Sequence, residues 1–126
     1  MTKRTVAILG ASADRGKFGN KSVRAHAQAG YEVFPVNPKG GQIEGLTVYR
    51  SLAEVPVEHL SRISVYLPPP VGLATLEDIA AKGSDEVWFN PGSESAEILA
   101  RARSLGINAI ADCSIVDLGV SPAQFP

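Results

Sequence analysis

Apolar runs alternate with amphipathic segments along the chain, in the order typical of α/β proteins. Residues 5–10 are rich in β-branched side chains with almost no polar interruption, which predicts a strand covered on both faces, as in a parallel sheet. Strands are also predicted at 31–37, 63–67, 86–90 and 107–112, with a shorter extended piece at 47–49. Helical patterns fall between them at 21–29, 71–82 and 96–105, with a short helix after Ser51.

This alternation predicts one α/β domain spanning residues 1–126. Consecutive strand–helix units favour a parallel sheet with right-handed crossovers. We expect a doubly wound, Rossmann-like sheet of about five strands in the order 3-2-1-4-5. Ligands of such sheets bind at the carboxyl ends of the strands, where the strand order reverses. The loops that follow the strands are therefore the places to search for a site.

Individual residues indicate which side of a predicted helix faces inward and where helices and strands end. Val23, Ala25 and Ala27 are predicted to face inward from the first helix. The three consecutive prolines at 68–70 predict a stiff loop that closes the preceding strand. Either Ser93 or Ser95 is expected to cap the helix near residue 96, and residues 114–126 show no clear periodicity.

Composition narrows the class of protein. Apolar residues make up 44% of the chain and charged residues 20%, which is ordinary for a globular domain. The net charge of −1 excludes a general attraction to nucleic acid or anionic membranes, and no apolar run is long enough to span a bilayer. Cys113 is the only cysteine, and no secretory signal precedes the first strand, so we expect a cytoplasmic protein without disulfides or a metal site.

The loop after the first strand has glycines at 10, 16 and 19 and the basic residues Arg15 and Lys17. These glycines match neither the dinucleotide fingerprint G-x-G-x-x-G nor the P-loop G-x-x-x-x-G-K-[ST]. A strand, a loop of small residues and a helix start still build an anion site, because the helix offers unpaired N–H groups. We expect this loop, with Ser12, Arg15, Lys17 and Lys21 near the helix start, to suit a pyrophosphate. The alternative is that the basic residues are merely solvated.

The loop after the second strand carries a lysine in place of a carboxylate. An NAD site needs an Asp or Glu there, whereas this chain has Asn37, Pro38 and Lys39. Lys39 would attract a phosphorylated ribose, as in NADP or coenzyme A; otherwise it only keeps a turn soluble. Leu67 and the following prolines offer either a rigid apolar wall for adenine or a strand end alone.

Together these loops resemble the CoA-binding domain. The resemblance rests on Gly10-Ala11-Ser12, Val36-Asn37-Pro38-Lys39, the proline-rich end of the strand at 63–67, and Asp112 with Cys113. That domain forms the N-terminal part of the succinyl-CoA synthetase alpha subunit and of related acyl-CoA synthetases. It also occurs alone, as small bacterial CoA-binding proteins. The resemblance covers residues 5 to about 115 of this chain.

The resemblance implies a position along CoA for each loop. Gly10, Ala11 and Ser12 would lie by the phosphates, Asn37, Pro38 and Lys39 by the ribose and its 3′-phosphate, Leu67, Pro68 and Pro69 by the adenine, and Asn90, Pro91 and Gly92 by the pantetheine arm. The phosphohistidine and grasp parts of the synthetases are absent, so no ligase reaction is expected.

We therefore expect a stand-alone module that binds CoA or an acyl-CoA without catalytic residues of its own, and that either senses this ligand or serves a partner enzyme. The protein partner expected is that enzyme or a second copy in a homo-oligomer. The alternatives are a small NADP-binding oxidoreductase or regulatory domain, and an interaction module that has lost its site. His26 and His59 are interpreted as ordinary exposed or packed histidines. Cys113 is interpreted as a small core residue, with a mixed disulfide to CoA under oxidation as the alternative.

Overall fold

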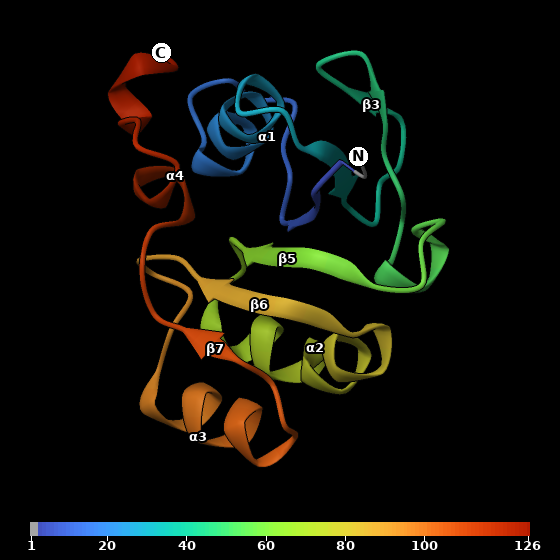
Figure 1. The fold of residues 1–126 in the computed structure, drawn as a ribbon, viewed down its shortest axis with the longest axis vertical. Helices are drawn as coiled ribbons and strands as arrows, with labels where there is room; N and C mark the ends of the chain where they lie inside the picture. Colours follow the sequence, from blue (N-terminus) through green and yellow to red (C-terminus); the bar gives the residue numbers. More distant parts are fainter. Residues whose placement is uncertain (1–2) are drawn as a thin grey trace.

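Five parallel strands form the central sheet of the computed structural model, which describes residues 3–126 (Figure 1). Their order is β2-β1-β5-β6-β7, and the strands are β1 (Thr5–Leu9), β2 (Glu32–Val36), β5 (Leu60–Val65), β6 (Ser84–Phe89) and β7 (Ala109–Ile110). Each neighbouring pair is parallel. The α/β, Rossmann-like class predicted from the sequence is confirmed.

The observed strand order is close to the predicted one. The difference lies beside β2, where the predicted order 3-2-1-4-5 placed a third strand. Tyr49 makes only a single parallel bridge to Val36, next to β2. The residues before it instead form an antiparallel hairpin, β3 (Gln42–Ile43) and β4 (Leu46–Thr47), where the sequence predicted only the extended piece that begins at residue 47. Pro35 lies in β2, at the edge of the sheet, where a strand tolerates its missing N–H.

Helices cover both faces of the sheet, as the apolar first strand predicted. On one face lie α1 (Phe18–Gln28) and α4 (Ser114–Asp117), and on the other α2 (Pro69–Lys82) and α3 (Ala96–Ser104) (Figure 1). Alternate residues of β1 point to the two faces: Val6 and Ile8 pack with Val23 of α1, whereas Ala7 and Leu9 join the core beneath α2.

Two details of the helices differ from the sequence prediction, and a third decides between the two caps that it left open. Pro69 and Pro70 form the first turn of α2, because a missing N–H costs nothing at that position, so only Pro68 remains in the loop. Ala27 of α1 is exposed, and His26 takes the inward position instead. Ser95 caps α3, accepting a hydrogen bond from the Ile98 N–H at 3.1 Å.

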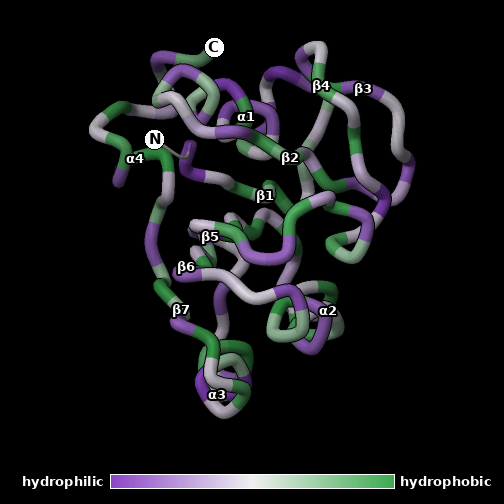
Figure 2. The backbone as a smooth tube through the Cα atoms, turned by 45° about the vertical axis from the view of Figure 1, so that its right-hand side comes forward, coloured by the Kyte–Doolittle hydropathy of each residue, from purple (hydrophilic) through white to green (hydrophobic). Residues whose placement is uncertain are grey.

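The C-terminal segment, residues 113–126, is structured despite its lack of periodicity. It forms α4 and the short helix η2 (Pro122–Gln124), and its end lies beside α1 in both views (Figures 1 and 2). Residues 52–54 form the one-turn helix η1 (Leu52–Glu54) after Ser51, as predicted. None of the helices within residues 3–126 is long and apolar enough to cross a membrane.

His26 is wholly buried in α1, and its Nδ1–H donates to the Ser22 carbonyl at 2.9 Å. Burial lowers the pKa of His26 from 6.5 to about 4, and the positive charge of Arg62 acts in the same direction. At pH 5 the imidazole is therefore neutral in the folded protein and protonated in the unfolded chain. The unfolded state binds the extra proton, so acid favours unfolding.

Stability is expected to fall as the pH drops from 6.5 towards 4, the interval between the two pKa values. Between pH 7 and pH 5 this histidine should lower the free energy of unfolding by about 2 kcal/mol. Urea unfolding at the two pH values measures the loss. His26→Gln should flatten the dependence, whereas His59→Gln, at an exposed histidine paired with Asp85, should preserve it. An unchanged slope in His26→Gln would contradict this account.

Candidate functional site

Two neighbouring depressions lie at the carboxyl ends of β1 and β5, and they share Gly10 and Leu67. The larger, of about 350 Å³, is lined by Gly10, Lys17, Phe18, Gly19, Tyr66, Leu67, Pro68, Pro69, Pro91, Gly92 and Ser93. The smaller, of about 160 Å³, is lined by Leu9, Gly10, Val36, Pro38, Arg50, Ser51, Leu52, Leu67, Val71, Thr75 and Asp78. The sheet thus brings loops from four strand ends to one edge, as a doubly wound topology requires.

The start of α1 packs directly against the end of β1. Gly10 has a positive φ of 82°, and a Cβ on Gly19 would lie 2.2 Å from the Gly10 carbonyl oxygen. Only a glycine at position 19 allows this approach. The first turn of a helix leaves N–H groups without intrahelical acceptors, and Phe18 and Gly19 of that turn line the larger depression. This end of α1 can therefore hold an anion.

The first loop, residues 10–17, is held by short turns of its own. Ser12 Oγ accepts a hydrogen bond from the Asp14 N–H at 3.1 Å, and Asp14 Oδ1 accepts one from the Gly16 N–H at 2.9 Å. Lys17 lines the larger depression, whereas Arg15 is turned aside into a 3.4 Å ion pair with Glu44 of the β3–β4 hairpin. Of these two basic residues, only Lys17 reaches the depression.

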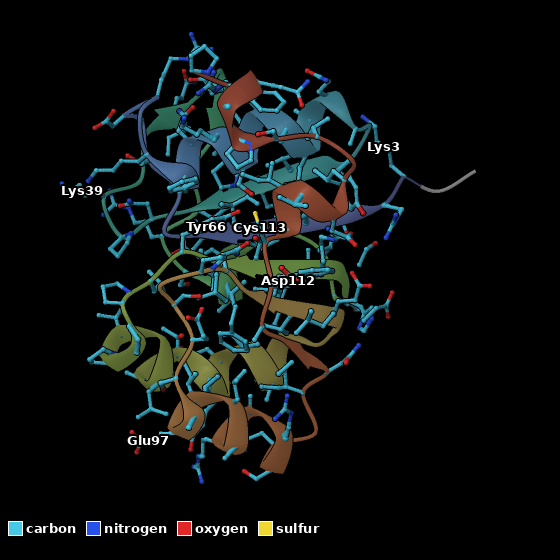
Figure 3. All side chains as sticks on the ribbon, turned by 90° about the vertical axis from the view of Figure 1, so that its left-hand side faces the viewer. Lys3, Lys39, Tyr66, Glu97, Asp112 and Cys113 are labelled. Carbon is cyan, nitrogen blue, oxygen red and sulfur yellow. The ribbon has the colours of Figure 1, made fainter. Side chains whose placement is uncertain are left out.

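The second loop is bonded to the first. Asn37 Nδ2 donates to the carbonyl of Ala11, itself wholly buried, at 2.9 Å, and Asn37 Oδ1 accepts from the Lys39 N–H at 2.9 Å. Pro38 lines the smaller depression. Lys39 is exposed at the edge of this face, opposite to Lys3 (Figure 3). Ser12 and Lys39 thus belong to adjoining loops of one surface.

Arg50 is a second cation at this edge that the sequence did not indicate. It lines the smaller depression, and its Nε lies 3.1 Å from where a Cβ on Gly40 would stand. Its guanidinium therefore lies against the loop of Lys39. The sequence pattern around Arg50 does not indicate a binding residue, because the arginine lies in an irregular stretch. The Val36–Tyr49 bridge brings it beside the second loop, and this bridge cannot be read from the sequence.

The third loop supplies an apolar wall, with a tyrosine that the sequence also left unmarked. Leu67, Pro68 and Pro69 line the larger depression, together with Tyr66. The Tyr66 hydroxyl lies 3.1 Å from Ser114 Oγ, and burial raises the pKa of Tyr66 above its usual value. This phenol stays neutral at physiological pH and serves as a hydrogen-bonding group.

The loop after β6 divides into a lining part and a supporting part. Pro91 and Gly92 line the larger depression. Asn90 is only 1% exposed, and its amide donates to Ser64 Oγ and the Val65 carbonyl and accepts from the N–H and Oγ of Ser114. Its side chain has no hydrogen-bonding group left for a ligand. It ties β5, β6 and α4 together beneath the site.

Cys113 stands at the start of the C-terminal segment, half-buried and beside Tyr66 (Figure 3). It packs partly against Ala25, Ile115 and Phe125. The cysteine is thus more accessible than the core residue expected from the sequence, while still contributing to a small apolar cluster.

Comparisons with known proteins give one consistent family. The sequence profile of a family described as CoA binding domain matches residues 4–119. The chain is 36% identical over 86 residues to the alpha subunit of an ADP-forming acetate–CoA ligase of Pyrococcus furiosus. It is 31% identical over 86 residues to a trans-feruloyl-CoA synthase from an unknown prokaryote. These matches cover 64% and 67% of this chain but 18% and 12% of the two relatives.

Solved structures extend the likeness to nearly whole chains. A conserved hypothetical protein of P. furiosus superimposes with a TM-score of 0.82 at 36% identity, covering 90% of this chain and 98% of the other. A Thermus thermophilus protein gives 0.83 at 27% identity, covering 91% and 87%. Relatives include archaeal proteins, so the likeness does not assign the chain to bacteria.

Proposed function

Because the chain belongs to the CoA binding domain family, we propose that it binds coenzyme A or an acyl-CoA across the two depressions at the carboxyl edge of the sheet. The observation that carries the proposal is the Asn37–Ala11 hydrogen bond, which holds the two loops side by side. One extended ligand can therefore contact both. Through this domain the protein would present or sense this ligand, and a partner enzyme or a second copy would use it.

In this proposal the pyrophosphate lies at the start of α1. The N–H groups of Phe18 and Gly19 and the ammonium of Lys17 supply positive charge there. The larger depression then continues between the Tyr66–Pro69 loop and Pro91–Gly92 and receives the pantetheine arm. Pro68 and Pro69 line this depression, so in this proposal they meet the arm and not the adenine expected from the sequence. Its walls are mainly apolar, and Phe18, 57% exposed, stands at its mouth. This suits a chain of methylenes and amides better than a second charged group.

The adenosine end lies in the smaller depression. Pro38, Leu52 and Leu67 offer apolar surface to a purine, and proline contributes that surface without losing side-chain entropy. Arg50 lines this depression and Lys39 directly follows its lining residue Pro38, so both cations would meet the 3′-phosphate of CoA. The same cations would attract the 2′-phosphate of NADP, so calorimetric titration with CoA, NADP and NAD is the direct test. Tight binding to NADP alone would refute the proposal.

Lys39→Ala is expected to weaken CoA about tenfold and dephospho-CoA about twofold or less, because it removes a charge-assisted contact to the 3′-phosphate. Isothermal titration with both ligands measures the difference. Lys3→Ala, which removes the same charge at the opposite edge of the sheet, should leave both affinities unchanged (Figure 3). Equal losses for the two ligands in Lys39→Ala would show that Lys39 does not face the 3′-phosphate.

A further inference from the structure

Arg24 of α1 joins the first loop to the end of the chain. Its Nη2 donates to the carbonyl of Arg15 at 2.9 Å and to that of Phe125 at 3.0 Å, and its Nη1 donates to the Pro126 carbonyl at 3.2 Å. Its Nε donates to Asn20 Oδ1 at 2.7 Å. One guanidinium thus bridges three parts of the fold: α1, the first loop and the C-terminal segment.

Asn20 carries this connection further into the first loop. It is wholly buried, and its Nδ2 donates to the Ser12 carbonyl at 2.9 Å and to Glu44 Oε2 at 3.1 Å. The Arg24–Asn20 pair therefore holds the loop at two carbonyls, Ser12 and Arg15. Because a trans peptide is planar, fixing these carbonyls also fixes the peptide planes that follow Ser12 and Arg15.

The C-terminal segment is anchored where Arg24 meets it. Phe125 is 6% exposed, packs with Ala25 and Ile115, and lies with its ring 5.8 Å from the Arg24 guanidinium carbon. Just before it, Ser121 and Gln124 form a capping box that fixes η2. Figures 1 and 2 show this end of the chain beside α1. The two carbonyls that Arg24 binds are thus presented by an ordered segment.

We propose that Arg24 is a positioning residue for the ligand's diphosphate, and that residues 121–126 set diphosphate affinity through it. The inference rests on the proposed function and adds a residue that touches no ligand. Residues 13–17 of this loop are exposed, and the loop's internal hydrogen bonds join only near neighbours in sequence. Asn37 holds the loop at Ala11, and the Arg24–Asn20 pair supplies the hydrogen bonds from Ser12 and Arg15 to α1. With the segment in place, Arg24 is held by acceptors on both sides and keeps the loop in its binding conformation.

The binding test uses Arg24→Gln, Phe125→Ala and the double variant. Each single change should weaken CoA about tenfold, as expected for losing charge-assisted hydrogen bonds, and the double variant should be little worse than either. Arg24→Lys should recover part of the loss. Arg103→Gln and Val116→Ala are matched controls, because Arg103 lies exposed on α3 and Val116 is 57% exposed on α4.

Adenosine 3′-monophosphate separates positioning from general loosening. It lacks the diphosphate, so its affinity, measured by competition against CoA, should stay within about twofold in all variants. Equal weakening of CoA and this fragment would overturn the inference. So would purely additive effects of the two single changes, because residues acting through one another are expected to be coupled.

A measurement without ligand distinguishes this inference from the proposed function. In ¹⁵N–¹H heteronuclear NOE spectra, Arg24→Gln and Phe125→Ala should both mobilise residues 12–17, while the controls leave them rigid. If the parent protein fails to bind CoA but the loop loosens as expected, the proposed function falls and the positioning role stands. If the loop remains as rigid as in the parent protein, the positioning role is refuted whatever the protein binds.

Discussion

Gly19→Ala is expected to cost more ligand affinity than any other single change at the site. A Cβ at this position would lie 2.2 Å from the Gly10 carbonyl oxygen and 3.3 Å from the Ala11 Cα, so α1 must move away from β1. Backbone cannot yield as a flexible side chain does, and we expect the free energy of unfolding to fall by about 3 kcal/mol. The displaced N–H groups of the first turn should weaken CoA on the order of 100-fold.

Gly16→Ala is the matched control, in the loop just before α1. Its Cβ would meet Asp14 Oδ1 at 3.3 Å, and that carboxylate is the end of a flexible side chain. We expect CoA affinity to change by about twofold or less. Urea unfolding and calorimetric titration of both variants give the comparison. Gly19→Ala that binds CoA like the parent protein would show that the start of α1 is not where the diphosphate lies.

The position of the two depressions could be predicted from the sequence because one rule governs where the strand ends meet. Parallel strands send all their carboxyl ends to one edge, so the residues after Leu9, Val36, Val65 and Phe89 had to converge. Gly10, Pro38, Leu67 and Pro91 indeed line the depressions there. The glycines at 10 and 19 fit neither standard motif, yet they perform the same task of bringing a helix start against a strand end.

The missed residues depend on contacts that no local pattern contains. Arg50 joins the site through a one-residue bridge, and Arg24 reaches carbonyls more than 100 positions away at Phe125 and Pro126. Arg62 is the clearest case, since it is 2% exposed within β5, between the rings of Tyr31 and Trp88. Because a buried strand is expected to be apolar, the sequence prediction started this strand after Arg62, at residue 63.

The polar character of one sheet face explains that error. Arg62 and Ser64 of β5 point to the face that carries α1 and α4, and both find polar partners on the four-residue helix α4. Asp117 of α4 pairs with Arg62 at 2.9 Å, and Ser114 bonds Ser64 at 2.7 Å. A short helix cannot supply enough apolar surface to cover such a face, so hydrogen bonds and ion pairs hold it in place. These pairings connect the sheet to the C-terminal segment.

Asn90→Ala is the change expected to be most damaging to stability on this polar face. The amide donates to Ser64 Oγ and the Val65 carbonyl and accepts from the N–H and Oγ of Ser114, all at 2.8–3.0 Å. Its loss therefore leaves several buried polar groups without these partners. We expect the free energy of unfolding to fall by about 4 kcal/mol. Asn108→Ala, at an exposed asparagine whose amide donates only to the Asp85 carbonyl, should cost about 0.5 kcal/mol.

Urea unfolding separates this supporting role from a contact with the pantetheine arm. A ligand-contacting Asn90 would leave the unliganded protein as stable as the parent when changed to alanine, and would lose only affinity. If Asn90 has a supporting role, its loss lowers stability without any ligand present and loosens α4, because the Ser114 N–H and hydroxyl lose their common acceptor. Unchanged stability in Asn90→Ala would therefore indicate that Asn90 contacts the ligand. The Arg62–Asp117 ion pair and the Ser64–Ser114 hydrogen bond would then be what holds α4 in place.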